Sequence, residues 1–113
     1  MKQIEDPQLL IVVTSFSKLV EAQSMARQLV MNQLAACVQI QGGINSIYRW
    51  EGKLCEESEI VLCAKTLSTK WSQIRLFIKE HHPYDLPEVL AFTPAQYDEQ
   101  YGAWVEAGIN SPS

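Results

Sequence analysis

The sequence contains little cysteine and few basic residues, and each shortage excludes a class of protein. Cysteine occurs only three times, an odd number without the spacing of a disulfide framework, so we expect free thiols and a cytoplasmic location. Thirteen acidic residues outnumber nine basic ones, which gives a net charge of −4. This charge argues against binding to nucleic acid, whose phosphates require a basic surface, and it provides no attraction to an anionic membrane.

Long hydrophobic runs are also missing. No stretch approaches the roughly 20 apolar residues that a membrane-spanning helix needs. Glu5, Asp6 and Pro7 interrupt the N-terminus, so we expect no signal peptide there. The 113 residues are 47% hydrophobic and 19% charged, which is a globular composition. We therefore expect a single domain over residues 1–113, with no membrane or nucleic-acid partner.

The hydrophobic pattern predicts a strand, a helix, two strands, a helix, a strand and a final helix, in that order. The expected ranges are 9–15, 17–32, 35–50, 54–66, 68–82, 88–93 and 98–107. Ser17 is suited to cap the first helix, and Ser68 or Thr69 the second, because short hydroxyl side chains bond to free amides there. Gly108 is suited to end the last helix.

The two central strands are expected to form one long hairpin, because the turn "EGK" at 51–53 contains a glycine. The Gly42-Gly43 pair predicts a bulge or bend in its first arm. Both arms exceed the usual strand length of about five or six residues. We therefore expect the hairpin to project beyond the domain.

The order β-α-β-β-α-β is typical of the ferredoxin-like α+β sandwich, with both main helices on one face of the sheet. The strand segments "LLIVV" and "IVLCA" are apolar at successive positions instead of alternating with polar residues. Strands with one face in water alternate, so the helix-free face must be covered. Another copy of the chain is the simplest candidate, and the terminal helix is the alternative.

Several segments, in order from Leu9 to Val105, resemble the CutA family of divalent-cation tolerance proteins. They are "LAACVQIQGGINSIYRWEGKL", "EIVLCAKT", "HHPYDLPEVLAF" and "YGAWV". The resemblance implies a non-enzymatic homotrimer whose sheets pack together and whose hairpins reach neighbouring subunits. It also implies a response to metal ions, with copper(II) or another divalent ion bound. The architecture is similar to PII signalling proteins, so the alternative function is binding of a small anionic ligand between subunits.

The adjacent histidines His81 and His82 match the positions that supply metal ligands in this family. Thr14 stands where members credited with a copper site have a cysteine. Neighbouring residues on a helix point about 100° apart, so the pair can share an ion only if the helix unwinds before Pro83. The alternative is structural: a histidine is favoured at a helix C-terminus, and His81 can pack along the apolar stripe.

Aromatic residues near the end of the hairpin and after the histidines are candidates for a ligand cleft. Tyr48 and Trp50 share one strand face, because side chains alternate along a strand. The family resemblance implies that such residues line clefts between subunits, where Lys65, Tyr84 and Glu88 would complete a small-molecule site. The same aromatics are equally suited to an interface core.

The remaining candidates favour structural interpretations. Acidic residues around the hairpin can gather cations, but charged strand ends also discourage edge pairing; they are Glu51, Glu56, Glu57 and Glu59. Cys37 and Cys63 lie in apolar strands, where burial makes a thiol inert. No phosphate loop, zinc spacing or nucleophile elbow is present, so we expect no enzymatic activity.

Overall fold

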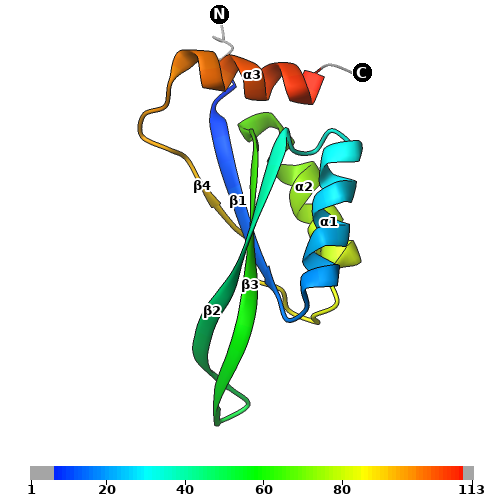
Figure 1. The fold of residues 1–113 in the computed structure, drawn as a ribbon, viewed down its shortest axis with the longest axis vertical. Helices are drawn as coiled ribbons and strands as arrows, with labels where there is room; N and C mark the ends of the chain where they lie inside the picture. Colours follow the sequence, from blue (N-terminus) through cyan, green and yellow to red (C-terminus); the bar gives the residue numbers. More distant parts are fainter. Residues whose placement is uncertain (1–6, 111–113) are drawn as a thin grey trace, which may run out of the picture.

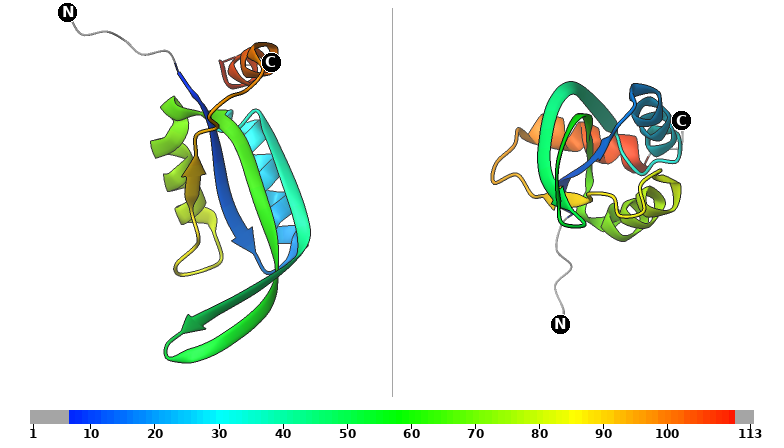
Figure 2. Two further views of the ribbon diagram at one scale, coloured as in Figure 1. Left: turned by 90° about the vertical axis from the view of Figure 1, so that its left-hand side faces the viewer. Right: turned by 90° about the horizontal axis from the view of Figure 1, so that it is seen from below.

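The computed structural model describes residues 7–110 and confirms the ferredoxin-like α+β arrangement (Figure 1). Its elements are β1 (Leu9–Phe16), α1 (Leu19–Met31), β2 (Cys37–Trp50), β3 (Lys53–Leu67), a short 3-10 turn η1 (Ser68–Lys70), α2 (Trp71–His81), β4 (Leu90–Phe92) and α3 (Glu99–Asn110). The sheet order is β2-β3-β1-β4, and all neighbouring strands are antiparallel. Helices α1 and α2 cover one face, while α3 crosses one end of the sheet (Figures 1 and 2).

The main core lies between the sheet and the helices α1 and α2. Strands β1 and β3 pair from Leu9–Leu67 to Phe16–Ile60, which directs alternate side chains of both toward the helices. Because paired residues of antiparallel strands point to the same face, the helix-facing side chains of β1 and β3 pack together. This core includes Val12, Phe16, Met25, Leu29, Leu62, Ala64, Ile74 and Ile78.

The opposite face of the sheet is also apolar, as the non-alternating strand segments predicted. Ile11 and Val13 of β1 are only partly buried on this face. Their partners on β4 are Phe92 and Leu90, which are 54% and 48% exposed. Helix α3 packs only against the end of the face at Leu9 and Leu67, through its buried residues Val105 and Ile109. Most of this face is therefore left uncovered within one subunit.

The β2–β3 hairpin projects beyond the rest of the subunit, as predicted (Figure 1). Its register shifts between Gln41 and Ile44, and Gly43 has a positive φ of 75°, so the glycine pair forms the expected bulge. The turn residues Glu51 and Gly52 both have positive φ, which matches the right-handed twist of a hairpin. The arms beyond the bulge pair only with each other.

Both predicted helix N-caps are wrong. Helix α1 begins after Lys18 rather than at Ser17, and α2 begins after Lys70 rather than at Ser68 or Thr69; neither N-terminus has a side-chain cap. The Ser68 hydroxyl instead accepts the backbone N–H of Gln8 at 3.1 Å.

Some of the other predicted helix and strand ends are confirmed by the structure, and others are wrong. Helix α1 ends at Met31, with Asn32 as its C-cap, and α2 ends at His81, two residues before Pro83; both ends agree with the prediction. Gly108 does not end α3, which continues to Asn110; its missing side chain instead admits Ala36, 3.1 Å from where a Cβ would stand. Strand β4 is shorter than predicted, because it pairs only with residues 11–13 of β1. Among residues 7–110, no helix has the length and apolarity to cross a bilayer.

Candidate functional site

The buried histidine of the pair is His82, which follows the last residue of α2 in an extended conformation. Its Nδ1 accepts the backbone N–H of Tyr84 at 3.0 Å, and its Nε2 lies 2.7 Å from the carbonyl oxygen of Ser15. A carbonyl only accepts, so Nε2 carries the proton and the ring is neutral. The ring also stacks on Phe16, with centroids 4.3 Å apart. Both nitrogens of His82 are thus occupied within the fold.

Burial lowers the pKa of His82, while the Ser15 carbonyl and the carboxylates Glu21 and Glu59 act in the opposite direction. The neutral ring is the form that this site holds. A metal ion would have to displace one of two backbone contacts to reach either nitrogen.

His81 is exposed to solvent, but its ring packs on Phe77 of the apolar stripe, as the structural alternative predicted. Its ring stacks on the ring of Phe77, with centroids 4.1 Å apart, and its Nδ1 lies 2.9 Å from the Phe77 carbonyl oxygen. Because that oxygen accepts, Nδ1 donates and the lone pair is left on Nε2. The chain bends inward immediately after α2, which buries His82 and leaves His81 outside.

The described residues do not form a resident copper site. The two rings face different surroundings, and only Nε2 of His81 has a lone pair that is not already engaged. Thr14 is fully buried on the helix-facing side of β1, and its hydroxyl has no hydrogen-bond partner among residues 7–110. No group of three or more His, Cys, Asp or Glu side chains in this part of the chain is placed to hold a metal ion.

Tyr84 pairs with a carboxylate that the sequence analysis assigned to a solvated strand end. Its hydroxyl donates to Glu59 at 2.8 Å, and Glu59 is only 9% exposed. Burial raises the pKa of Tyr84 to about 12, and this hydrogen bond is the second-largest cause. The Tyr84 ring also meets His82 edge-on at 4.7 Å. Alternation along β3 puts Glu59 on the same face as the exposed Glu57, so no local signal separates the two carboxylates.

One subunit does not bring the predicted cleft residues together. Tyr48 pairs with Cys55 on β3, and Lys65 lies ten residues further along that strand. Ten strand residues span about 33 Å, which no side chain bridges. Lys65 donates instead to the side-chain oxygen of Gln39 at 2.8 Å. Trp50 and Glu88 are exposed. A cleft that contains all five residues requires a second copy of the chain.

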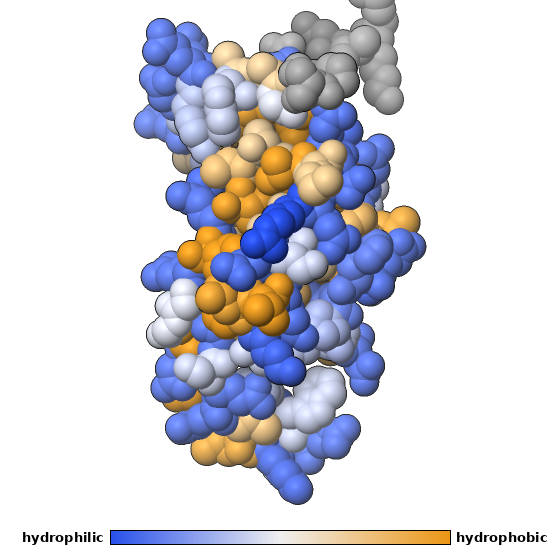
Figure 3. Space-filling view, turned by 45° about the vertical axis from the view of Figure 1, so that its right-hand side comes forward, coloured by the Kyte–Doolittle hydropathy of each residue, from blue (hydrophilic) through white to orange (hydrophobic). Residues whose placement is uncertain are grey.

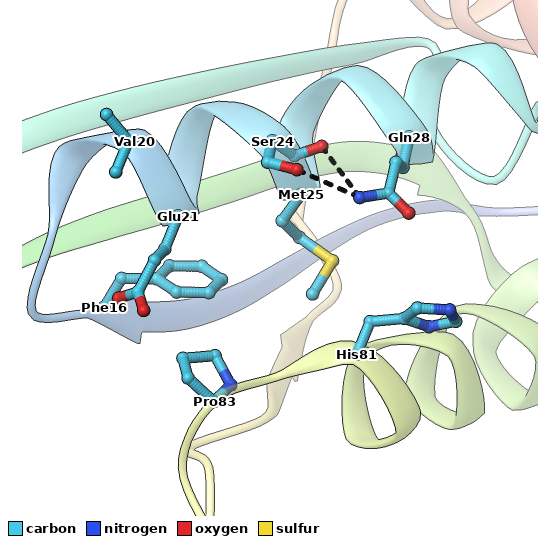
Figure 4. Close-up of a pocket in the computed structure, with 8 residues that line it drawn as sticks. All are labelled: Phe16, Val20, Glu21, Ser24, Met25, Gln28, His81 and Pro83. Carbon is cyan, nitrogen blue, oxygen red and sulfur yellow. Dashed lines mark hydrogen bonds between the residues drawn. The ribbon is translucent and has the colours of Figure 1, made fainter.

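A separate pocket of about 290 Å³ lies between α1 and the end of α2 (Figure 4). Its lining includes Glu21 and Met25 from α1 and His81 and Pro83 from the other side. The three cysteines, Cys37, Cys55 and Cys63, carry free thiols, as predicted.

Comparison with known proteins gives one consistent family. A sequence model described as CutA1 divalent ion tolerance protein matches residues 10–108. A divalent-cation tolerance protein CutA of Yersinia pestis (strain Pestoides F) is 39% identical over 88 residues, which are 78% of this chain and 74% of that protein.

Solved structures agree in fold. The structure of CutA from Synechococcus elongatus PCC7942 has a TM-score of 0.88 and 36% identity, covering 95% of each chain. The crystal structure of CutA from Xylella fastidiosa has a TM-score of 0.88 and 31% identity, covering 91% of this chain and 99% of that one.

Proposed function

Because this chain belongs to the CutA1 divalent ion tolerance family, we propose that it acts as a non-enzymatic homotrimer in the response to divalent metal ions. The proposed absence of enzymatic activity is supported by the state of two titratable side chains with shifted pKa values, His82 and Tyr84. Both ring nitrogens of His82 are used in holding the chain, and Tyr84, with a pKa of about 12, keeps its proton on the bond to Glu59. Neither group is poised to exchange a proton near neutral pH.

The uncovered apolar face of the sheet carries the assembly part of the proposal. Leu90 and Phe92 are about half exposed beside Ile11 and Val13. Fully burying an exposed side chain of this kind stabilises by about 1.5–3 kcal/mol, and about half of that remains for each half-exposed residue, so several together favour association. The projecting hairpin adds the exposed residue Leu54, which suits contact with a neighbour. The uncovered apolar face favours self-association. The proposed count of three subunits comes from the resemblance to the CutA family.

Light scattering on two matched variants tests the assembly. Phe92→Glu places a charge on the open face and is expected to reduce the measured mass from three chains to one. Leu76→Glu introduces the same charge at an equally exposed position on α2 and is expected to remain a trimer. A Phe92→Glu protein that stays trimeric contradicts assembly through this face.

We further propose that copper(II) contacts the chain through Nε2 of His81 alone, as a weak and exchangeable ligand. Of the four ring nitrogens in the two histidines, Nε2 of His81 carries the exposed lone pair. Copper(II) binds imidazole more tightly than other common divalent ions do. Electron paramagnetic resonance of the copper-loaded protein should show one coordinated imidazole. His81→Ala should abolish this signal and His82→Gln should retain it; loss of the signal in His82→Gln alone contradicts the assignment.

The second candidate function is PII-like binding of a small anionic ligand between subunits. Lys65 favours it, because this cation on the open face donates its hydrogen bond to the neutral amide of Gln39. Tyr48, Trp50, Tyr84 and Glu88 of a neighbouring copy would complete the cleft. Titration with nucleotides, followed by tryptophan fluorescence, tests this function. Saturable binding that Lys65→Gln removes supports it, and no saturable signal in the wild type counts against it.

The cytoplasmic location is also a proposal, supported by the three free thiols. Cell fractionation tests it: the protein should be found in the cytoplasmic fraction, and recovery outside it contradicts the proposal.

A further inference from the structure

The pocket between α1 and α2 lies on the side of the subunit opposite to the uncovered sheet face. Its volume of about 290 Å³ matches the small end of ligand pockets, which begin near 300 Å³. Figure 3 turns the helix-bearing side forward and shows apolar side chains among hydrophilic ones there. The proposed association uses the other face of the sheet, so it does not require the residues that line this pocket.

One carboxylate gives the pocket its charge. Glu21 is the only acidic residue in the lining, and no lysine or arginine lines it. Its Oε1 atom is buried and accepts no hydrogen bond from any residue between 7 and 110. In Figure 4 the Glu21 carboxylate points from α1 toward the end of α2. A buried carboxylate oxygen is costly without a donor, so the pocket favours a cationic N–H group at this point.

The walls around the carboxylate are apolar. Phe16, Val20, Met25 and Pro83 contribute them, and Figure 4 shows the Met25 thioether pointing between the two helices. This surface suits a short hydrocarbon chain, which gains from leaving water. The ligand that matches both features has one positive end and one apolar end.

The other polar groups of the pocket do not assemble a metal site around Glu21. His81 lies at the opposite end of the pocket in Figure 4. The side-chain N–H group of Gln28 donates to the hydroxyl and carbonyl oxygens of Ser24. Among residues 7–110, Glu21 belongs to no group of three or more His, Cys, Asp or Glu side chains that is placed to hold a divalent ion. An organic anion would be repelled.

We propose that this pocket binds a small aliphatic amine in its ammonium form. The ammonium group donates to Oε1 of Glu21, and the alkyl chain lies against Val20 and Met25. The proposal is independent of metal binding and of the cleft between subunits, because it uses neither the His81 nitrogen nor Lys65.

Nuclear magnetic resonance titration of the full chain with n-pentylammonium, in the absence of metal, tests the proposal. We expect saturable shifts of amides around the pocket, with one ligand bound per chain. The uncharged analogue n-pentanol should bind at least about tenfold more weakly, because it lacks the charge-assisted bond. Glu21→Gln, which keeps the shape of the side chain, should weaken n-pentylammonium binding by the same factor.

Two further variants keep the test decisive. Glu57→Gln removes an exposed carboxylate on the hairpin and should bind as the wild type does. Ser24→Lys changes an exposed lining residue three positions after Glu21 on the same face of α1, so it should fold, and its own ammonium group should compete at Glu21 and weaken binding at least about tenfold. Equal affinity in Glu21→Gln and the wild type, equal affinity for n-pentanol, or no saturable binding overturns the proposal.

Discussion

His82 is held by both ring nitrogens, and this predicts how stability changes with pH. Only the neutral ring can donate to the Ser15 carbonyl while accepting the N–H of Tyr84. Burial lowers the pKa of His82 below its ordinary value of 6.5 in the native state. The unfolded chain therefore takes up the proton at a higher pH than the native protein does. The stabilisation is fully present above pH 6.5 and is lost as the pH falls through the lowered pKa.

Urea unfolding at fixed protein concentration, measured from about pH 8 to about pH 5, tests this residue directly. The wild type should lose stability across the acidic part of this range. His82→Gln should show a smaller loss, because it has no ring to protonate. His81→Gln, which removes the exposed histidine, should keep the wild-type profile. Identical profiles for wild type and His82→Gln contradict the account of this contact.

Thr14 predicts a substitution that leaves stability unchanged or raises it. Its side chain is fully buried, and its hydroxyl has no hydrogen-bond partner among residues 7–110. Thr14→Val replaces the hydroxyl by a methyl group of similar size. We expect the free energy of unfolding to rise by about 1–2 kcal/mol, because the desolvation penalty of the hydroxyl is removed. Thr93→Val, at an exposed position, should change it little. A clear loss of stability in Thr14→Val contradicts this interpretation.

The residue pattern did not predict the surroundings of every candidate side chain. Helical spacing placed His81 after Phe77 and Ile78 on one stripe, but the helix ends at that point and the next residue turns inward. The direction of a side chain just beyond a helix depends on backbone angles that periodicity does not contain. Glu59 was likewise grouped with its acidic neighbours, although its burial depends on Tyr84, which is 25 residues away in the chain.

At the level of elements, the bulge of β2 depends on the positive φ of one glycine, Gly43. Gly43 has a φ of 75°, and a Cβ there would meet no atom within 4 Å. Gly43→Ala should therefore lower the free energy of unfolding by about 1–2 kcal/mol, through backbone strain alone. Gly42→Ala is the matched control, because its φ is not positive and its nearest atom is at 4.0 Å. Chemical denaturation of both variants compares them; equal stabilities contradict the assignment of the strain to Gly43.

Element ends were predictable where one residue type determines them. Pro83 stops α2, and the paired glycines break the register of β2, since both effects are properties of the local backbone. Ser17 and Ser68 were poor guides, because a hydroxyl near a helix start has other partners available, which for Ser17 is the side chain of Tyr84. Ser68 takes the N–H of Gln8, a contact between segments 60 residues apart that local pattern does not reveal.

At the level of the whole molecule, the exposed face and the hairpin follow from patterns within single strands. Apolar residues at successive positions of β1 and β3 indicate two covered faces, and arm lengths well beyond an ordinary strand indicate projection. The part of the sheet face that α3 covers could not be predicted from the sequence. It depends on how Val105 and Ile109 meet Leu9 and Leu67 at one end of the sheet.

Sedimentation equilibrium of the wild-type protein, diluted into the low micromolar range, tests most directly whether copies of the chain cover this face. The account predicts a single species with three times the mass of one chain across the dilution series. A compact, folded species with the mass of one chain would contradict it, because Leu90 and Phe92 would then remain in water.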